Sequence, residues 1–144
     1  MGQDRESLRD LDGVRVSVDD LPLSVRSGGL SSERLRQSVE AQLRQAGIRV
    51  LTTGDFPVGD PFIRVRVNAA AGPCGGVAYT VDVDFVQMVF MRRNPAVTFN
   101  RAETWRAAPA LGTGDPANLT ADVMRALYEE VRQFIDDYQV VNRT

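Results

Sequence analysis

The sequence predicts a single α+β domain, with one mixed, mainly antiparallel five-stranded sheet in the chain order β-α-β-β-β-β-α. Two amphipathic helices are expected to pack on one face of this sheet. Apolar residues recur every three to four positions near residues 31–46 and 115–138, which is typical of helices. They recur every second position across residues 61–105, which is typical of strands. The 144 residues are 43% hydrophobic, which is enough for one core.

The first elements form a strand, a helix and a second strand. Valines alternate with polar residues over residues 14–18, which predicts a short half-buried strand, and residues 23–29 are expected to be loop. Ser31 has the side chain of a helix N-cap, and Gly47 is suited to the left-handed position that closes a helix. The short run Ile48–Leu51 is then expected to be the second strand, so that the three elements form a crossover unit.

A three-stranded antiparallel meander is expected next. Alternation over residues 63–67 is followed by a glycine-rich turn, a strand of about 15 residues ending at Met91, and a return strand over residues 97–105. With symmetric turns, one register places three apolar residues side by side on the inner face, namely Ile63, Val83 and Trp105. The same register places three charged residues side by side on the outer face, namely Arg64, Asp82 and Arg106.

A long helix is expected to end the domain. Residues 107–114 are predicted to be a connector, and Asp115-Pro116 is a good helix start, with Thr120 as an alternative cap. The apolar stripe of this helix consists of Val123, Leu127, Val131, Phe134, Ile135 and Tyr138. The domain is expected to span residues 1–144, with residues 1–12 as a flexible leader because they carry no periodic apolar pattern.

The composition argues against an enzyme. The chain has no histidine and no lysine, all 17 basic residues are arginine, and Cys74 is the only cysteine. Arginine binds anions but does not release its proton at working pH, so the usual bases and Schiff-base nucleophiles are missing. Cys74 lies in a glycine-rich turn with no histidine or lysine to lower its pKa. We expect no catalytic residue and no cofactor.

Two acidic residues are the best candidates for chemistry. Asp82 and Asp84 share one face of the long strand, and two such carboxylates can hold Mg²⁺ in nucleotidyl- or phosphoryl-transferases. The glycines Gly75-Gly76 lie too close to them for that architecture, and arginines are expected alongside. A solvated salt-bridge ladder is the favoured interpretation, and a Mg²⁺-dependent transferase is the alternative. Residues 112–114 resemble part of a phosphate loop, but lack its lysine.

The end of the long strand is apolar on both faces. Its outer face changes from threonine and aspartate to Val86, Met88 and Phe90, and the turn after it carries Arg92 and Arg93. In one interpretation the N-terminal segment or a β-bulge covers this end. In the other, these five residues form an exposed binding surface for a protein partner, a second copy of the chain or a lipid surface. Protein binding or self-association is the favoured function.

Charge and hydropathy limit the other partners. The formal charge is −2, so nucleic-acid binding is not expected. No stretch approaches the roughly 20 apolar residues that cross a bilayer. The charged, unpatterned start is typical of an exported protein whose signal peptide has been removed, with the cytoplasm as the alternative location.

Three phrases carry a resemblance to known proteins. They are Leu43-Arg44-Gln45-Ala46-Gly47-Ile48, Ala78-Tyr79-Thr80-Val81-Asp82-Val83 and Gln133-Phe134-Ile135-Asp136-Asp137-Tyr138. With them, the chain resembles small exported bacterial α+β proteins of unassigned function. Its element order is broadly similar to periplasmic accessory domains of the Tol and curli-secretion type. The resemblance implies a cell-envelope setting and a non-enzymatic role.

Overall fold

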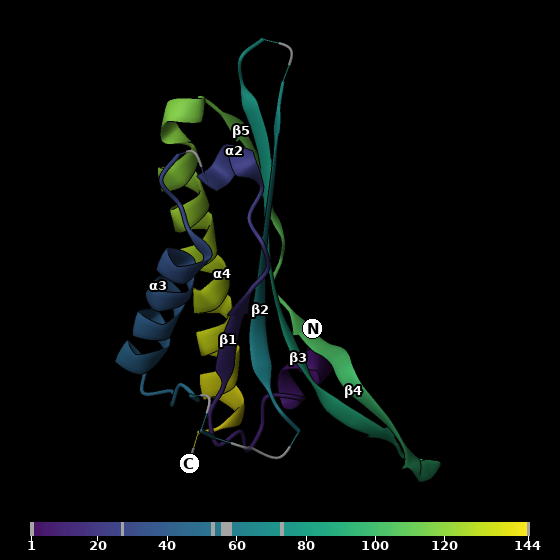
Figure 1. Cartoon of the computed structure of the whole chain (residues 1–144). Helices are drawn as coiled ribbons and strands as arrows, with labels where there is room; N and C mark the ends of the chain where they lie inside the picture. Colours follow the sequence, from purple (N-terminus) through teal and green to yellow (C-terminus); the bar gives the residue numbers. More distant parts are fainter. Residues whose placement is uncertain (1, 27, 53, 56–58, 73, 144) are drawn as a thin grey trace.

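The computed structural model describes residues 2–26, 28–52, 54–55, 59–72 and 74–143. Five strands form the sheet: β1 (Arg15–Val18), β2 (Phe62–Ala71), β3 (Val77–Met91), β4 (Asn94–Arg106) and β5 (Ala110–Gly114). The helices are α1 (Gly2–Glu6), α2 (Leu23–Arg26), α3 (Ser32–Gln45) and α4 (Leu119–Val141), with a 3₁₀ turn over Pro116–Asn118. Helices α3 and α4 lie side by side on one face of the sheet (Figure 1). The predicted α+β class is confirmed.

The sheet is mixed, and β3 is its longest strand. β1 pairs in parallel with β2, and β2 pairs antiparallel with β3. The other edge of β3 is shared, because β4 pairs with residues 84–91 and β5 with residues 77–81. Between these two partners the Ala107 N–H donates to the Val83 carbonyl over 2.9 Å. β3 is therefore the strand that joins all parts of the sheet.

The fifth strand is not the one predicted. In place of a strand over Ile48–Leu51, the structure has one parallel bridge between Val14 and Val50, and the crossover through α3 leads from β1 to β2. The predicted connector contains β5 instead. Its sequence, Ala-Leu-Gly-Thr-Gly, has no apolar alternation, and a Cβ at Gly112 would overlap the side chain of Tyr79. Tertiary pairing with Tyr79 thus decides this strand.

The predicted register is shifted by two residues on β3. Ile63 and Trp105 both lie opposite Phe85 and not Val83, and Arg64 and Arg106 flank Asp84 and not Asp82. The prediction assumed symmetric turns. β4 instead contains three irregularities, and the two that lie opposite the steps 85–86 and 87–89 of β3 each shift the pairing by one residue. The β2–β3 turn also centres on residue 74. Because the shift is an even number of residues, each side chain keeps its predicted face.

Both ends of α3 are confirmed. The Ser31 hydroxyl accepts the Arg34 N–H over 3.1 Å, and Gly47 has φ +80°. The Ile48 N–H donates to the Leu43 carbonyl, and the Gly47 N–H donates to the Arg44 carbonyl, each over 3.0 Å, which is a Schellman closure.

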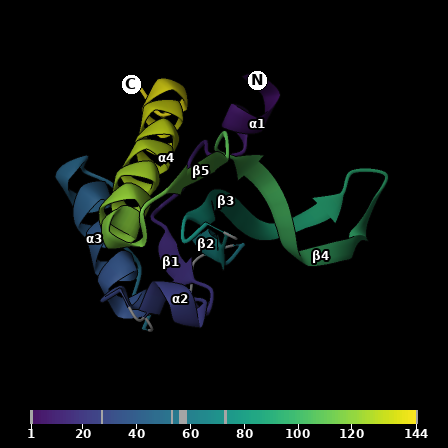
Figure 2. The same cartoon turned by 90° about the horizontal axis from the view of Figure 1, so that it is seen from above.

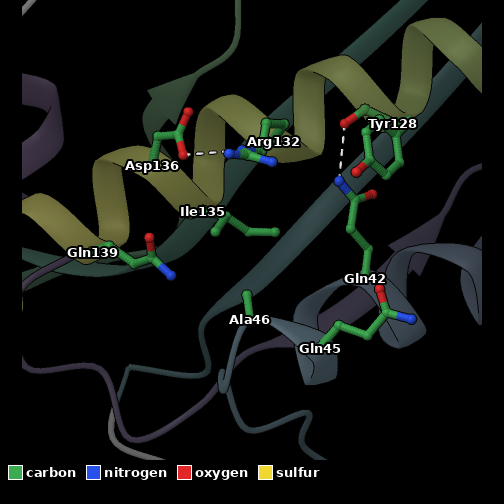
Figure 3. A pocket seen from close by; sticks show the side chains of 8 residues that line it. All are labelled: Gln42, Gln45, Ala46, Tyr128, Arg132, Ile135, Asp136 and Gln139. Atoms are coloured by element: carbon green, nitrogen blue, oxygen red, sulfur yellow. Dashed lines mark hydrogen bonds and ion pairs between the residues drawn. The ribbon is translucent and has the colours of Figure 1, made fainter.

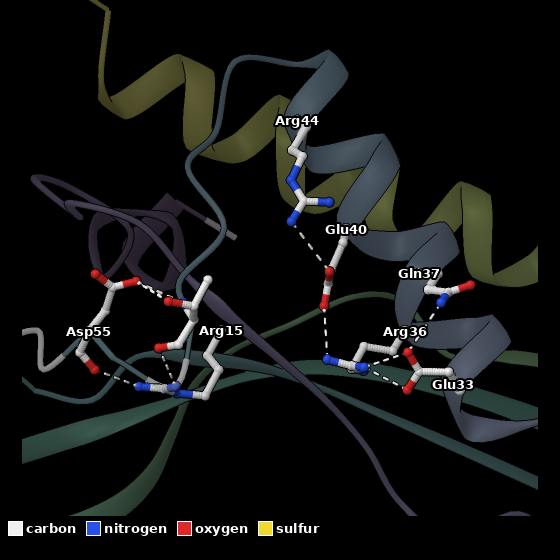
Figure 4. Close-up of polar contacts among 8 residues, drawn as sticks. Arg15, Glu33, Arg36, Gln37, Glu40, Arg44 and Asp55 are labelled. Carbon is white, nitrogen blue, oxygen red and sulfur yellow. Dashed lines mark hydrogen bonds and ion pairs between the residues drawn. The ribbon is translucent and has the colours of Figure 1, made fainter.

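Ion pairs run along the exposed face of α3 (Figure 4). Glu33, Arg36, Glu40 and Arg44 are linked in that order at helical i,i+3 and i,i+4 spacing. In the same view Arg15 of β1 donates to the backbone of the loop that contains Asp55. These are solvated contacts that contribute little each.

Helix α4 is preceded by a capped turn. Asp115 accepts the Ala117 N–H over 2.9 Å with Pro116 at the first position, as predicted, and the α-helix itself starts at Leu119. Residues 23–26, expected to be loop, form the short helix α2, because Val25 is buried in the core.

The core lies between the sheet and the two long helices. Phe134 of α4 is its centre, with ring centroids 5.6 Å from Phe85, 5.3 Å from Trp105 and 6.4 Å from Tyr138. The Trp105 contact is edge-to-face, an arrangement that aromatic rings favour. None of the helices in the described part of the chain combines the length and the apolar character that crossing a bilayer requires.

The first residues lie on the domain, whereas the sequence suggested a flexible leader. Leu8 is fully buried, which no periodic pattern indicated. Asp137 of α4 accepts the Arg5 Nε–H over 2.8 Å and the Trp105 indole N–H over 2.9 Å. Asn142 donates to the Leu8 carbonyl over 2.9 Å. The N-terminal segment thus links the end of α4 to β4.

Candidate functional site

A two-stranded hairpin extends beyond the body of the sheet. β2 begins at Phe62, opposite Val86, so the rest of β3 has only β4 as a full neighbour. We call residues 87–101, which comprise the end of β3, the turn and the start of β4, the arm. The arm leads away from the side of the sheet that carries α3 and α4 (Figure 2). The base of the arm is also tied to the loop before β2, because the Met88 N–H donates to the Gly59 carbonyl over 2.7 Å.

The arm is apolar on both faces. Phe90 is 65% exposed and Met88 43%, and they share the outer face, the face of the sheet opposite the helices. Phe99 is 52% exposed and pairs with Val89, so it lies on the other face together with the exposed Val97. A two-stranded hairpin with exposed apolar residues on both faces is marginal by itself in water.

Val86 was predicted to be exposed, but it is buried in the structure. Its side chain is only 1% exposed and lies between Phe62 and Glu103 on the outer face. The guanidinium of Arg101 sits 5.2 Å above the ring of Phe62 and helps to close this region. Val86 is therefore a structural residue at the base of the arm.

The other four predicted residues lie where a partner can reach them. Met88 and Phe90 are exposed, and Arg92 and Arg93 are exposed in the turn at the tip. The N-terminal segment does not cover this surface, because it meets the arm at the opposite face: the Gln87 amide donates to the Ser7 carbonyl over 3.1 Å. β-bulges are present, but in β4.

Sequence reasoning missed Val97 and Phe99 as surface residues. Their alternation predicts the inner face, and that is the face they occupy. The helix layer does not extend over the arm (Figures 1 and 2), so the inner face is open at this point. A strand of 15 residues, far longer than the usual five to six, was the available signal.

The outer face of the body carries a network of charges centred on Asp84. Arg64 donates to both of its oxygens over 2.9 and 2.8 Å, and Arg66 donates over 3.0 Å. The Asp84 hydrogen bond is the main cause that raises the pKa of Arg64. Arg106 in turn holds the pKa of Glu103 below its ordinary value through a bidentate contact.

This network occupies the carboxylate that a metal would need. Both oxygens of Asp84 accept hydrogen bonds from arginine, and its side chain is buried. In the part of the chain that the structure describes, no three acidic or cysteine side chains lie close enough to hold a metal ion. Asp84 fits the salt-bridge interpretation, whereas Asp82 has no ion pair with another described residue.

One buried carboxyl group was not singled out from the sequence. Glu130 of α4 is buried, and neither of its oxygens has a hydrogen-bond partner among the described residues. Burial raises the pKa of Glu130 to about 8, and the negative charge of Asp82 adds to the rise. The group is therefore mostly protonated at neutral pH. Its side chain is only 2% exposed to solvent.

A groove with a volume of about 240 Å³ lies between α3 and α4 (Figure 3). Gln42 bridges it by donating to the Tyr128 carbonyl over 3.0 Å, and Arg132 pairs with Asp136 along one wall. Its charged groups are paired with each other and do not converge on a common point. The groove follows from the helix packing and carries no chemistry.

The remaining sequence candidates are in ordinary positions. Cys74 is exposed in the β2–β3 turn. Residues 112–114 are part of β5 and not a loop, so their backbone N–H groups cannot cradle a phosphate as a loop would.

No protein-family model matches the chain, and no curated protein matches it. Among solved structures, it is similar to PelC from Paraburkholderia phytofirmans, solved as a dodecamer, with 15% identity, a TM-score of 0.49, and 92% of this chain and 88% of that chain covered. It is also similar to a minor lipoprotein from Acinetobacter baumannii, with 14% identity, a TM-score of 0.37, and 91% and 94% covered. Similarity at this level assigns no function.

Proposed function

We propose that this protein is a non-catalytic binding domain of the bacterial cell envelope that contacts a protein through its arm. The observation that carries the proposal is the exposure of large apolar side chains on both faces of the arm, chiefly Phe90 and Phe99. Surface apolar residues scattered singly need no explanation, but a continuous cluster on a projecting hairpin does. The envelope location follows from the sequence resemblance and is part of the proposal.

The body of the domain supports a binding role in a second way. Its charged outer face is satisfied by internal ion pairs, and its most perturbed carboxyl group, Glu130, is enclosed in the core. Neither feature offers a group that could act on a substrate. The arm, by contrast, exposes large apolar side chains to solvent, chiefly Phe90 and Phe99.

Site-specific photo-cross-linking tests the proposal. A photoreactive phenylalanine analogue is placed at Phe90 or at Phe99 in the bacterium that makes the protein. Tyr128 is the matched control, because it is an aromatic residue of similar exposure, 51%, on the helix side. We expect protein adducts at both arm positions and few at Tyr128. Absence of adducts at the arm, or equal yields at all three positions, would show that the arm is not the binding surface.

Fractionation of the same cells tests the location. Recovery of the protein with the periplasmic or membrane fractions is expected. Recovery in the cytoplasmic fraction would contradict the envelope part of the proposal and leave the binding part to be decided by the cross-links.

A further inference from the structure

The outer face of the sheet has a second apolar region, at the end opposite the arm. Strands β2, β3 and β5 form a shallow depression there, with a volume of about 210 Å³. Its floor consists of small side chains, Ala70 and Ala78, and its rim includes Leu111, which is 78% exposed. Small residues beside an exposed leucine leave room for a large apolar side chain.

The arm and the rest of the chain are opposite in charge. The arm contains three arginines and no acidic residue. The rest of the chain has 14 arginines and 19 acidic residues, so it carries a charge of −5. On the outer face, Asp82 has no ion pair with another described residue. Opposite charges on two surfaces favour their association and fix its orientation.

The spacing along β3 makes the outer face self-complementary. Phe90 and Ala78 each lie six residues from Asp84, on the same face, which corresponds to about 20 Å in either direction. A twofold axis through the charged centre would therefore place the Phe90 of one copy opposite the Ala78 of another. Such isologous contacts, in which the same surface serves both subunits, are the commonest in soluble oligomers. The arm leans away from the helix layer, toward the side where such a copy would lie (Figure 2).

The tip of the arm argues against a lipid surface as the occupant. Arg92 and Arg93 are the most distal residues, ahead of the apolar ones. If the arm entered a bilayer by its tip, these arginines would go deepest, at a cost of about 2.5–3.5 kcal/mol each near the centre.

We propose that the arm of one copy docks on the outer sheet face of a second copy, with Phe90 over Ala78 and Leu111. This inference rests on the proposed function, since it names the partner of the arm. The arrangement buries the apolar surface at both ends of the outer face in one step. It leaves the charged centre, around Asp84, between the two copies.

The experiment uses the purified full chain and measures its mass by sedimentation velocity over a concentration series. The arm variant is Phe90→Asp, the face variant is Leu111→Asp, and the control is Val140→Asp, an exposed apolar residue of α4. We expect the wild type and the control to form dimers, and each of the other variants to weaken the dimer by about 30-fold or more, as for a central interface residue. Circular dichroism checks that all four proteins fold.

Mixing the two interface variants gives the sharpest result. In a mixed dimer, the intact arm of the face variant meets the intact face of the arm variant, so the mixture should dimerise more tightly than either variant alone. A wild type that stays monomeric, a face variant that dimerises like the wild type, or a mixture no tighter than its components would each overturn the inference. So would a monomeric wild type that cosediments with vesicles of anionic lipid.

The cross-linking experiment separates this inference from the proposed function. Adducts at Phe90 with the mass of two copies support both. Adducts with a different protein keep the proposed function and overturn the inference, and no adducts at all overturn the proposed function.

Discussion

Strand β3 passes through two environments that differ in what covers its side chains. Between Val81 and Phe85 its inner face packs against α4, with Phe85 and Trp105 around the ring of Phe134. Between Gln87 and Met91 the strand is just as apolar, but its full neighbour is β4 alone. The core explains the apolar residues of the first half. It does not explain those of the second half, and this difference is the reason to assign them a partner.

The largest expected effect is on the free energy of unfolding, from the half of β3 that α4 covers (the covered half). Replacing Phe134 by alanine should reduce the free energy of unfolding by about 3–5 kcal/mol, because the ring is fully buried among three aromatic neighbours and a cavity would remain. Urea denaturation monitored by Trp105 fluorescence measures the change. A loss below about 1 kcal/mol would mean that the helix layer and β3 pack less closely than the structure has them.

The charged centre of the outer face gives the next effect. Asp84→Asn should reduce stability by about 2–4 kcal/mol, because it leaves Arg64 and Arg66 without their shared carboxylate at a buried position. Asp82→Asn is the matched control on the same strand and face, and it should change stability by no more than about 0.5 kcal/mol. The same urea series compares the two. Equal losses would mean that the pairing centres on Asp82, as the sequence-based register had it.

Glu130 gives the covered half a dependence on pH. Its pKa is raised to about 8 in the folded protein, so between its ordinary value of 4.5 and that value the unfolded chain releases a proton that the folded protein keeps. Stability should therefore be highest below this range and fall with rising pH, by about 1.4 kcal/mol for each pH unit within it. Glu130→Gln should remove this slope. The exposed neighbour Glu129→Gln should keep it, and a slope that survives in Glu130→Gln would assign it to another group.

Local patterns in the sequence predicted most of the covered half. The caps of α3 at Ser31 and Gly47 and the apolar stripe of α4 depend on a few adjacent residues, and they are confirmed. The register depends on two irregularities in β4 whose positions cannot be predicted from adjacent residues. The sequence therefore placed Asp82 between Arg64 and Arg106, where the structure has Asp84. The strand β5 depends on pairing across the sheet with residues 77–81 of β3, where Gly112 lies opposite Tyr79.

The sequence predicted where the candidate site lies along the chain, but not which of its residues are exposed. Apolar residues on both faces of a long strand marked its end correctly, and Met88, Phe90, Arg92 and Arg93 lie there. The sequence does not show where the helix layer stops. It therefore could not separate the buried Val86 from its exposed neighbours, or show that Phe99 on the inner face is open.

The smallest expected effect is the one that most directly tests the contrast between the two halves. Phe99→Ser removes an aromatic side chain as large as that of Phe134, but from the arm, where it is half exposed and packs against no helix. At concentrations where the protein is monomeric, the free energy of unfolding should change by no more than about 0.5 kcal/mol, in the same urea assay. A loss above about 2 kcal/mol would mean that the arm packs on its own chain in solution, and its apolar residues would then need no partner.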